Sequence, residues 1–360
     1  MLRVAAGRPT EGPLAGGRRV QRWAPVSGAQ LRCQITDPRI PESSGLAAAG
    51  SRLYTINDGG QTIQVYVLDR LCHVQRVIQG TINPYDVEDL VRTSDGAFWL
   101  ADIGDNDEVR STIALERLTE DGQARLYRLK YPDGPHDAEG LVINADGAPF
   151  IVTKSPLTSS VYTPVGALST AHTTALKKVA TLTFLPTGTA GGPVGTVSQV
   201  LVTGAAISPD GQHLVLRTYT DAYLWDLTAG DVVGALRTGR RTRIPLPATA
   251  QGEGVTFTPD SQSLITSTER LPAPVYLVPL PISVATSSAA PTTPPSSAPS
   301  TGRTTAADAE QTPAAAPSPL ARAASGGTSS TLRNVLIAVV VAGGVLWAAS
   351  RLRRDRRRPG

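Results

Sequence analysis

The sequence predicts an all-β fold made of one repeated hairpin unit, and three observations support this prediction. A five-residue phrase recurs as ESSGL, DVEDL, DAEGL, LVTGA and QGEGV, starting at residues 42, 86, 137, 201 and 251. Eight residues after the third position of three copies stand Gly96, Gly147 and Gly211, each preceded by aspartate. The third positions are 44, 51, 64 and 50 residues apart, which is the length of one blade of a β-propeller. We therefore expect a five-bladed β-propeller.

Each blade is expected to begin with a tight hairpin, because Asp-Gly between two apolar runs is the strongest short-range hairpin signal. The fifth copy has Ser261 in place of the glycine, again after aspartate, and the first copy closes its turn two residues sooner, at Gly50. The longest interval, between Glu139 and Thr203, leaves a six-bladed propeller as the alternative.

The strands follow one another within a propeller domain over residues 30–282. Four apolar runs separated by turn residues form each of the first four blades, whereas the fifth has three. The runs are SSGLAAAG, RLYTIND, IQVYVLD and HVQRVIQ; EDLVRTS, AFWLADI, TIALERL and ARLYRLK; EGLVINA, PFIVTKS, SSVYTPV and KKVATLT; TGAAISP, HLVLRTY, AYLWDLT and RTRIPLP; and GEGVTFT, SLITSTE and PVYLVPL.

A short strand before the first blade, LRCQI at residues 31–35, is expected to complete the fifth. This pairing closes the ring and leaves no exposed sheet edge. It also brings Cys33 close to Cys72 at the outer edge of the first blade, so we predict a disulfide between them, in keeping with an oxidising compartment. The alternative is two unrelated buried thiols.

Both flanks of the propeller differ from it in composition. Residues 1–29 place arginines among Gly, Pro and Ala without an apolar run long enough for a signal peptide, so we expect a disordered segment, and the route of export stays open. Residues 283–332 are rich in Ser, Thr, Pro and Ala, and such a linker cannot bury a core and stays extended.

A membrane anchor is predicted near the C-terminus. VLIAVVVAGGVLWAA carries no charge, and we expect a single transmembrane helix over residues 333–350. The arginine-rich tail at residues 351–360 is cytoplasmic by the positive-inside rule, which places the propeller outside the cell. The opposite orientation, a tail anchor with a cytoplasmic propeller, explains the missing leader but carries six arginines across the membrane.

Charge argues against one class of partner. The formal net charge is +4, much of the basic excess lies in the tail, and no basic patch interleaved with aromatic residues occurs in the propeller. We therefore expect no nucleic-acid partner. The expected protein is a monomer whose partners are the membrane and an extracellular ligand or protein.

Oxygen-bearing residues occupy the third position of all five phrases. Because the first strand of each blade lines the centre of a propeller, these side chains should point toward one axis. Three carboxylates converging without a counter-charge repel one another, and a hard cation such as Ca²⁺ relieves the repulsion. Zinc is disfavoured because neither cysteine nor histidine recurs with the phrase. The predicted metal ligands are Ser44, Glu88, Glu139, Thr203 and Glu253. Hydrogen-bonded, hydrated carboxylates are the alternative.

The order Ser, Glu, Glu, Thr, Glu on five innermost strands resembles the calcium-activated nucleotidases of the apyrase family. The phrases ESSGL, DAEGL and QGEGV carry this resemblance, which covers about residues 30–282. The chain is also similar to phytase-like and esterase-like propeller domains of bacteria. The resemblance implies a five-bladed propeller with Ca²⁺ at its centre, and it implies nucleotide hydrolysis less strongly.

Loops between second and third strands, and residues before the first strands, should surround one mouth of the propeller. The predicted ligand-binding rim is Asn57, Asp58, Asp105, Asn106, Lys154, Arg217, Tyr219 and Glu269. The candidate catalytic residues are Asp58, Asp102, His136, Lys154 and Arg217. In this reading Lys154 and Arg217 bind an anionic substrate, and an aspartate or His136 activates water. Alternatively, these residues cap turns and balance charge.

Two functions fit these features. The first is a Ca²⁺-stabilised surface module that binds an extracellular ligand or protein. The second is a Ca²⁺-dependent hydrolase of phosphate esters, nucleotides or lactones at the mouth. The sequence contains no G-x-S-x-G, H-E-x-x-H or P-loop motif. We expect the binding module, because propellers bind partners on this face across many unrelated functions.

Overall fold

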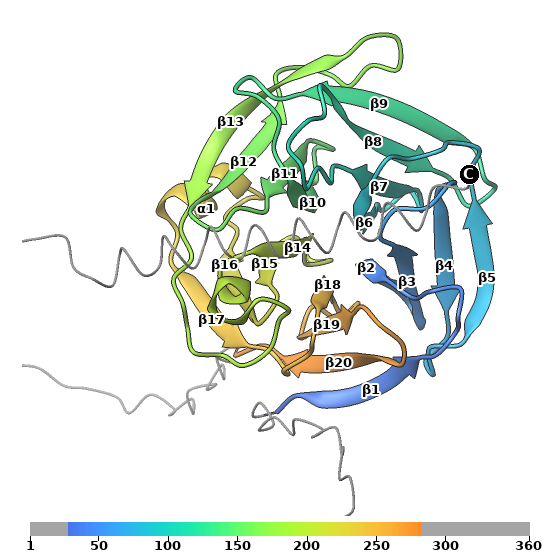
Figure 1. Ribbon diagram of the computed structural model, residues 1–360, viewed down its shortest axis with the longest axis vertical. Helices are drawn as coiled ribbons and strands as arrows, with labels where there is room; N and C mark the ends of the chain where they lie inside the picture. The colour runs from blue at the N-terminus through green and yellow to red at the C-terminus, as the bar shows by residue number, and fades with distance from the viewer. Residues whose placement is uncertain (1–27, 282–360) are drawn as a thin grey trace, which may run out of the picture.

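The computed structural model describes residues 28–281, which form a nearly all-β, propeller-like fold. This part of the chain contains strands β1 to β20, one short α-helix and one 3-10 helix. The strands form four-stranded antiparallel units arranged around a common centre, with the first strand of each unit innermost (Figure 1).

The units follow the chain in order. The first contains β2 (Ser43–Ala49), β3 (Arg52–Asn57), β4 (Gln64–Leu68) and β5 (Val74–Gln79), and the second contains β6 (Val87–Arg92), β7 (Phe98–Asp102), β8 (Ile113–Leu118) and β9 (Ala124–Lys130). The third contains β10 (Ala138–Ile143), β11 (Pro149–Thr153), β12 (Ser159–Pro164) and β13 (Thr174–Leu182). The fourth contains β14 (Val202–Ile207), β15 (His213–Thr218), β16 (Asp221–Asp226) and β17 (Arg241–Pro245), and the last contains β18 (Gly252–Phe257), β19 (Ser263–Thr268) and β20 (Ala273–Pro279).

Strand β1 (Gln30–Ile35) completes the last unit. It pairs antiparallel with β20, from Gln30 opposite Leu277 to Ile35 opposite Ala273. The predicted closure by a strand from the N-terminal side is therefore confirmed, and it covers the outer edge of β20. The second and third units also join, through a short parallel pairing of β9 with β13, into one eight-stranded sheet.

The innermost strands contact one another in a closed sequence. Strand β2 contacts β6, β6 contacts β10, β10 contacts β14, β14 contacts β18, and β18 returns to β2. Apolar clusters fill the spaces between neighbouring units. One cluster, for example, joins Tyr54 and Val65 of the first unit to Leu90 and Phe98 of the second. Another joins Leu46 and Leu53 to Ile265 and Val275 across the closure.

The hairpin turns lie where the sequence predicts them. Gly96, Gly147 and Gly211 have φ values of 85°, 80° and 71°, in the left-handed region that glycine adopts without strain. Ser261 takes the same conformation, with φ of 61°. Asp95, Asp210 and Asp260 stabilise their turns, since each accepts a hydrogen bond from a hydroxyl two residues earlier.

Two helical elements were not predicted. The α-helix α1 (Val232–Thr238) begins after Asp231, whose side chain accepts a hydrogen bond from the Gly234 N–H. The 3-10 helix η1 (Gly195–Gln199) lies in the connection between β13 and β14. That connection, residues 183–201, contains no strand.

The predicted disulfide between Cys33 and Cys72 is present, with the two Cα atoms 5.8 Å apart. Cys33 lies on β1 and Cys72 lies in the turn between β4 and β5, so the bond links the last unit to the first. Within residues 28–281 no helix is long and apolar enough to cross a bilayer. The predicted N-terminal disordered segment, linker, transmembrane helix and arginine-rich tail lie outside the described residues, apart from the overlap at residues 28 and 29.

Candidate functional site

A change of register interrupts each innermost strand at the third position of the repeated phrase. The pairing shifts occur between Ser43 and Leu46, Val87 and Asp89, Ala138 and Gly140, Val202 and Gly204, and Gly252 and Val255. Such an irregularity redirects a side chain and leaves it outside the hydrogen-bonded ladder. The side chains redirected here are the five predicted metal ligands, and all five are buried.

The two hydroxyl-bearing members of this set bond to backbone. The Ser44 hydroxyl donates to the Glu88 carbonyl at 2.5 Å, and the Thr203 hydroxyl donates to the Gly252 carbonyl at 3.1 Å. Each bond joins one innermost strand to its neighbour. The structure thus gives these hydroxyls a different partner from the predicted cation, and their role as metal ligands stays a prediction.

Glu139 is close enough to Glu88 and to Glu253 for the charges to interact, but these glutamates do not lack a counter-charge. Lys154, directly after β11, forms an ion pair with Glu139 and lies 5.2 Å from the centre of the Tyr219 ring. Burial raises the pKa of Glu139 to about 8, and Lys154 opposes that rise. Lys154 therefore supplies a counter-charge that sequence reasoning did not place among the glutamates, because its side chain is only 10% exposed and lies beside Glu139 rather than on an exposed rim.

Arg217 is also buried rather than on the rim. Its side chain is 1% exposed, and Nη1 donates to the carbonyls of Gly254 at 2.5 Å and Ser267 at 2.8 Å. Burial lowers the pKa of Arg217 to about 10, and the nearby Glu253 opposes that change. Arg217 therefore joins β15 to β18 and β19, and it has no free path to a substrate at the surface.

An acidic cluster forms where the first two units meet. Asp58 follows β3, Asp86 precedes β6 and Glu88 lies on β6, and each offers one carboxylate oxygen within 4.8 Å of the other two. Asp58 and Asp86 are half-buried, whereas Glu88 is buried. Glu88 is a predicted metal ligand, Asp58 is a predicted rim and catalytic residue, and Asp86 was expected on the rim among the residues before the first strands.

Electrostatics in the acidic cluster favour either protonation or a cation. Burial raises the pKa of Glu88 well above its ordinary value, and the charges of Asp58 and Glu139 raise it further. Burial, and then the charges of Asp58 and Asp137, raise the pKa of Asp86 in the same way. Gly104 permits this close packing, because a Cβ there would overlap Glu88 Oε1 and lie 2.7 Å from Asp86 Oδ2.

Two predicted aspartates hold loops in place beside the acidic cluster. Asp102 forms an ion pair with Arg110 at 2.9 Å and accepts the Asp86 N–H at 2.8 Å, so it positions Asp86. Asp105 is fully buried and accepts the N–H groups of Val109 and Arg110. These contacts match the alternative reading of both aspartates as turn residues.

The remaining predicted residues do not join the acidic cluster. His136 bonds to Asp133 at 3.0 Å and to the Tyr162 hydroxyl at 2.9 Å. Asn57 donates to the Arg39 carbonyl at 2.7 Å, and Asn106 is exposed. Tyr219 and Glu269 are buried, and Glu269 accepts a hydrogen bond from the Gln251 side chain. Their roles in ligand binding stay predictions.

Sequence reasoning missed Asp89, although the phrase contained the signal. Four copies have glycine at the fourth position, where the second has Asp89. The Asp89 side chain is fully buried and accepts the N–H groups of Leu90 at 2.8 Å, Leu141 at 2.8 Å and Ala205 at 3.2 Å. It therefore ties β6 to β10 and β14.

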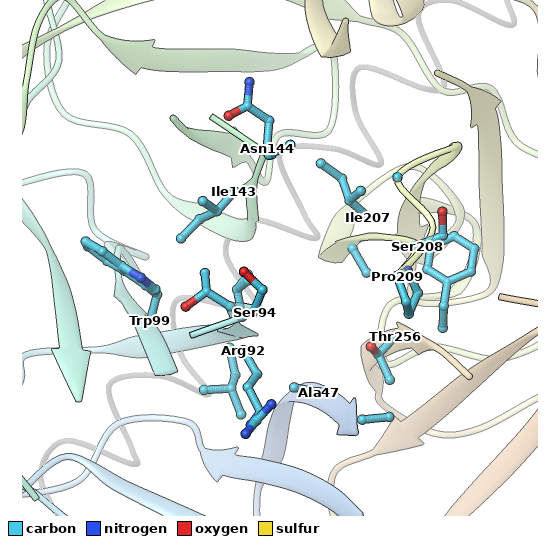
Figure 2. A pocket seen from close by; sticks show the side chains of 18 of the residues that line it. Ala47, Arg92, Ser94, Trp99, Ile143, Asn144, Ile207, Ser208, Pro209 and Thr256 are labelled. Atoms are coloured by element: carbon cyan, nitrogen blue, oxygen red, sulfur yellow. The ribbon is translucent and has the colours of Figure 1, made fainter. Parts of the chain in front are cut away.

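A cavity at the opposite end of the innermost strands was also missed. It measures about 730 Å³ and is lined by the last residues of these strands and by the hairpin turns (Figure 2). The repeated Asp-Gly turns predicted the hairpins, and in the structure they also place polar residues at this end.

Comparisons with known proteins assign neither a family nor a function to this chain. No family model and no curated protein matches the chain. Solved structures with similar folds include a gluconolactonase from Xanthomonas campestris, with 19% identity over 66% of this chain and 72% of that one, and a TM-score of 0.40. A luciferin-regenerating enzyme shares 14% identity over 66% of this chain and 76% of that one, with a TM-score of 0.39. Virginiamycin B lyase from Staphylococcus aureus shares 11% identity over 70% of this chain and 99% of that one, with a TM-score of 0.36.

None of these three structures is a nucleotidase or a phytase, so the resemblance to those families stays a prediction. All three are below 20% identity. The chemistry proposed below therefore rests on residues of this chain alone.

Proposed function

We propose that this chain is a five-bladed propeller that binds a divalent cation, with preference for Ca²⁺, at Asp58, Asp86 and Glu88, and that it acts as a binding module at that mouth. One observation carries the proposal: three carboxylates from two adjacent units approach to within 4.8 Å. Such a set of hard oxygen donors suits Ca²⁺, which takes six to eight oxygens in irregular geometry.

A second observation supports a cation in this region. Oε2 of Glu139 is buried and has no hydrogen-bond partner among the described residues, although Oε1 is paired with Lys154. The Glu139 charge raises the pKa of Glu88, so the two groups interact. A cation bound by the acidic cluster would lower the repulsion for all of these carboxylates.

The proposed location is the cell exterior, with residues 333–350 as the anchor. The disulfide between Cys33 and Cys72 supports this location, because structural disulfides persist in oxidising compartments. Ca²⁺ is also available there at concentrations that suit weak sites, with Kd values on the order of 10⁻⁴ to 10⁻³ M.

Calorimetric titration of the full chain with CaCl₂ and with MgCl₂ tests the cation site. We expect saturable Ca²⁺ binding that is lost in Asp86→Asn and Glu88→Gln. The control is Asp146→Asn, which removes an exposed carboxylate at the opposite end of the fold. If Asp86→Asn and Asp146→Asn bound Ca²⁺ with equal affinity, the proposed location of the cation site would be wrong.

A Ca²⁺-dependent hydrolase of phosphate esters, nucleotides or lactones is the second candidate. It is favoured by the partial exposure of Asp58 and Asp86, which leaves a bound cation open to a ligand from solvent. When bound, such an ion would polarise a carbonyl or phosphoryl oxygen of the substrate. Asp102 and Arg110 would keep Asp86 in position.

Turnover measurements separate the two candidates. The full chain is assayed with nucleoside diphosphates, aryl phosphates and lactones, with Ca²⁺ and with EDTA. Turnover that needs Ca²⁺ and falls in Asp58→Asn identifies the hydrolase. A rise in melting temperature with Ca²⁺, without turnover, supports the binding module.

A further inference from the structure

The cavity at the turn end of the innermost strands lies away from the acidic cluster. Strand β6 shows this directly, because Glu88 stands near its beginning whereas Val91 and Arg92 at its end line the cavity. Asp89 lies between them, fully buried and bonded to three backbone N–H groups of β6, β10 and β14. The cavity is therefore a separate feature of the fold.

All five innermost strands supply apolar side chains to the cavity. They contribute Ala47, Val91, Ile143, Ile207 and Phe257. The volume of about 730 Å³ falls within the range of roughly 300–1,000 Å³ that is typical of small-molecule sites. Polar residues such as Thr93, Ser94 and Asn144 also line the cavity, so its mixed interior suits a ligand with one or two rings and a polar group.

The charged residues that line the cavity are Arg92, Arg117 and Asp95. Asp95 is held anionic, since hydrogen bonds from Thr93 and Arg117 lower its pKa to about 2. Arg92 forms an ion pair with Glu120 at 3.2 Å, whereas Arg117 uses one nitrogen for Asp95, at 2.6 Å. The remaining N–H groups of Arg117 can therefore still donate to an anionic group of a ligand.

One aromatic wall completes the site. Trp99 lies at the side of the cavity (Figure 2), and its ring stacks on Tyr127 with the centroids 5.3 Å apart. Stacking fixes the orientation of the Trp99 ring, so the ring can contact a flat ligand at little entropic cost.

From these features we infer that the cavity binds a small anionic molecule with an apolar aromatic body, such as an aryl carboxylate or aryl sulfonate. The anionic group lies against Arg117, and the rings lie among Trp99, Ile143 and Ile207. This site is independent of the proposed cation site.

The probe is anilinonaphthalene sulfonate, an aryl sulfonate whose fluorescence rises in apolar surroundings. We expect binding to the full chain with energy transfer from tryptophan, and a marked decrease of that transfer in Trp99→Phe, although the sequence has three other tryptophans. Ile143→Trp fills the cavity and should reduce affinity at least about ten-fold, and Ser94→Trp at the mouth should do the same. Val165→Trp adds the same ring at an exposed position outside the cavity and should leave affinity unchanged.

Charge is tested separately. Arg117→Gln should lower the affinity for the sulfonate probe by roughly ten-fold. Arg52→Gln, at an exposed arginine outside the cavity lining, should leave that affinity unchanged. The uncharged N-phenyl-1-naphthylamine should bind more weakly than the sulfonate and be insensitive to Arg117→Gln. Equal probe affinity in Ile143→Trp, Ser94→Trp and Val165→Trp, or stronger binding of the uncharged probe, would overturn the inference. Circular dichroism melts confirm that each variant is folded.

Discussion

At the scale of single residues, Asp89 has the most specific structural role. Innermost strands leave backbone N–H groups facing the centre without a ladder partner, and buried N–H groups of this kind need an acceptor. The Asp89 carboxylate accepts two of them, from Leu141 and Ala205, and both bonds go to Oδ2. Burial raises its pKa, and the three N–H donors oppose that rise.

Asp89→Asn tests this role. The amide has one oxygen, and its NH₂ group would face a backbone N–H, so at least one buried donor would lose its partner. We expect a loss of about 1–3 kcal/mol in the free energy of unfolding, measured by urea denaturation. Asp146→Asn, at an exposed position, should change it by less than about 0.5 kcal/mol. Equal stability of the two variants would contradict the assigned role.

The ion pair of Lys154 with Glu139 leads to a prediction of a different kind, because the two side chains are only 10% and 6% exposed. Lys154→Met leaves the Glu139 carboxylate without its cation, and we expect a loss of roughly 3–5 kcal/mol. Glu139→Gln combined with Lys154→Met should recover most of this loss, since no charge then remains unpaired. A double variant as unstable as Lys154→Met would show that packing, and not charge, explains the loss.

Glu116 on β8 makes stability depend on pH. Glu116 is fully buried, and neither carboxylate oxygen has a hydrogen-bond partner among the described residues. Burial, and to a smaller extent the charge of Asp102, raises the pKa of Glu116 from 4.5 to about 8. Because the folded state then binds more protons than the unfolded state, Glu116 destabilises the fold as pH rises from about 4.5 to 8.

The expected size of this effect is on the order of 4 kcal/mol at full burial. Glu116→Gln should remove it, so urea denaturation at pH 5 and pH 8.5 should show a smaller decrease in the variant than in the native chain. A decrease of the same size in both proteins would mean that Glu116 is already ionised when folded.

At the scale of elements, β1 and its disulfide close the fold. The bond joins residues 39 positions apart and connects the last unit to the first. Disulfides of this kind contribute typically ~2–4 kcal/mol, mainly by restricting the unfolded chain. We expect dithiothreitol to lower the melting temperature of the native chain by several degrees. In the Cys33→Ser, Cys72→Ser double variant the reductant should have no effect, because the sequence has no other cysteine. An unchanged native melting temperature would exclude a structural role.

At the scale of the whole molecule, the two ends of the fold differ in chemistry. Carboxylates gather where the innermost strands begin, and a cavity with two guanidinium groups lies where they end. The same repeated strand supplies both ends, and Asp89 separates them. One fold can therefore present a proposed cation site and a proposed anion site without contact between them.

Much of the fold was predictable from local signals, whereas the site was predictable only in part. Turn glycines such as Gly96 and the pairing of Leu31 to Ile35 with the last unit follow from turn chemistry and from strand counting. The acidic cluster depends on where separate units meet, so Asp86 gained its importance only from the neighbouring Asp58. Likewise, the depth of Lys154 follows from the packing of β11 beside β10, which no local pattern encodes.

The most direct test of the proposed cation site is an anomalous difference map from crystals of the protein grown with Ca²⁺. We predict a peak within about 2.3–2.6 Å of carboxylate oxygens of Asp58, Asp86 and Glu88. A map without a peak there, or with its strongest peak among Ser44, Thr203 and Glu253, would contradict the assignment.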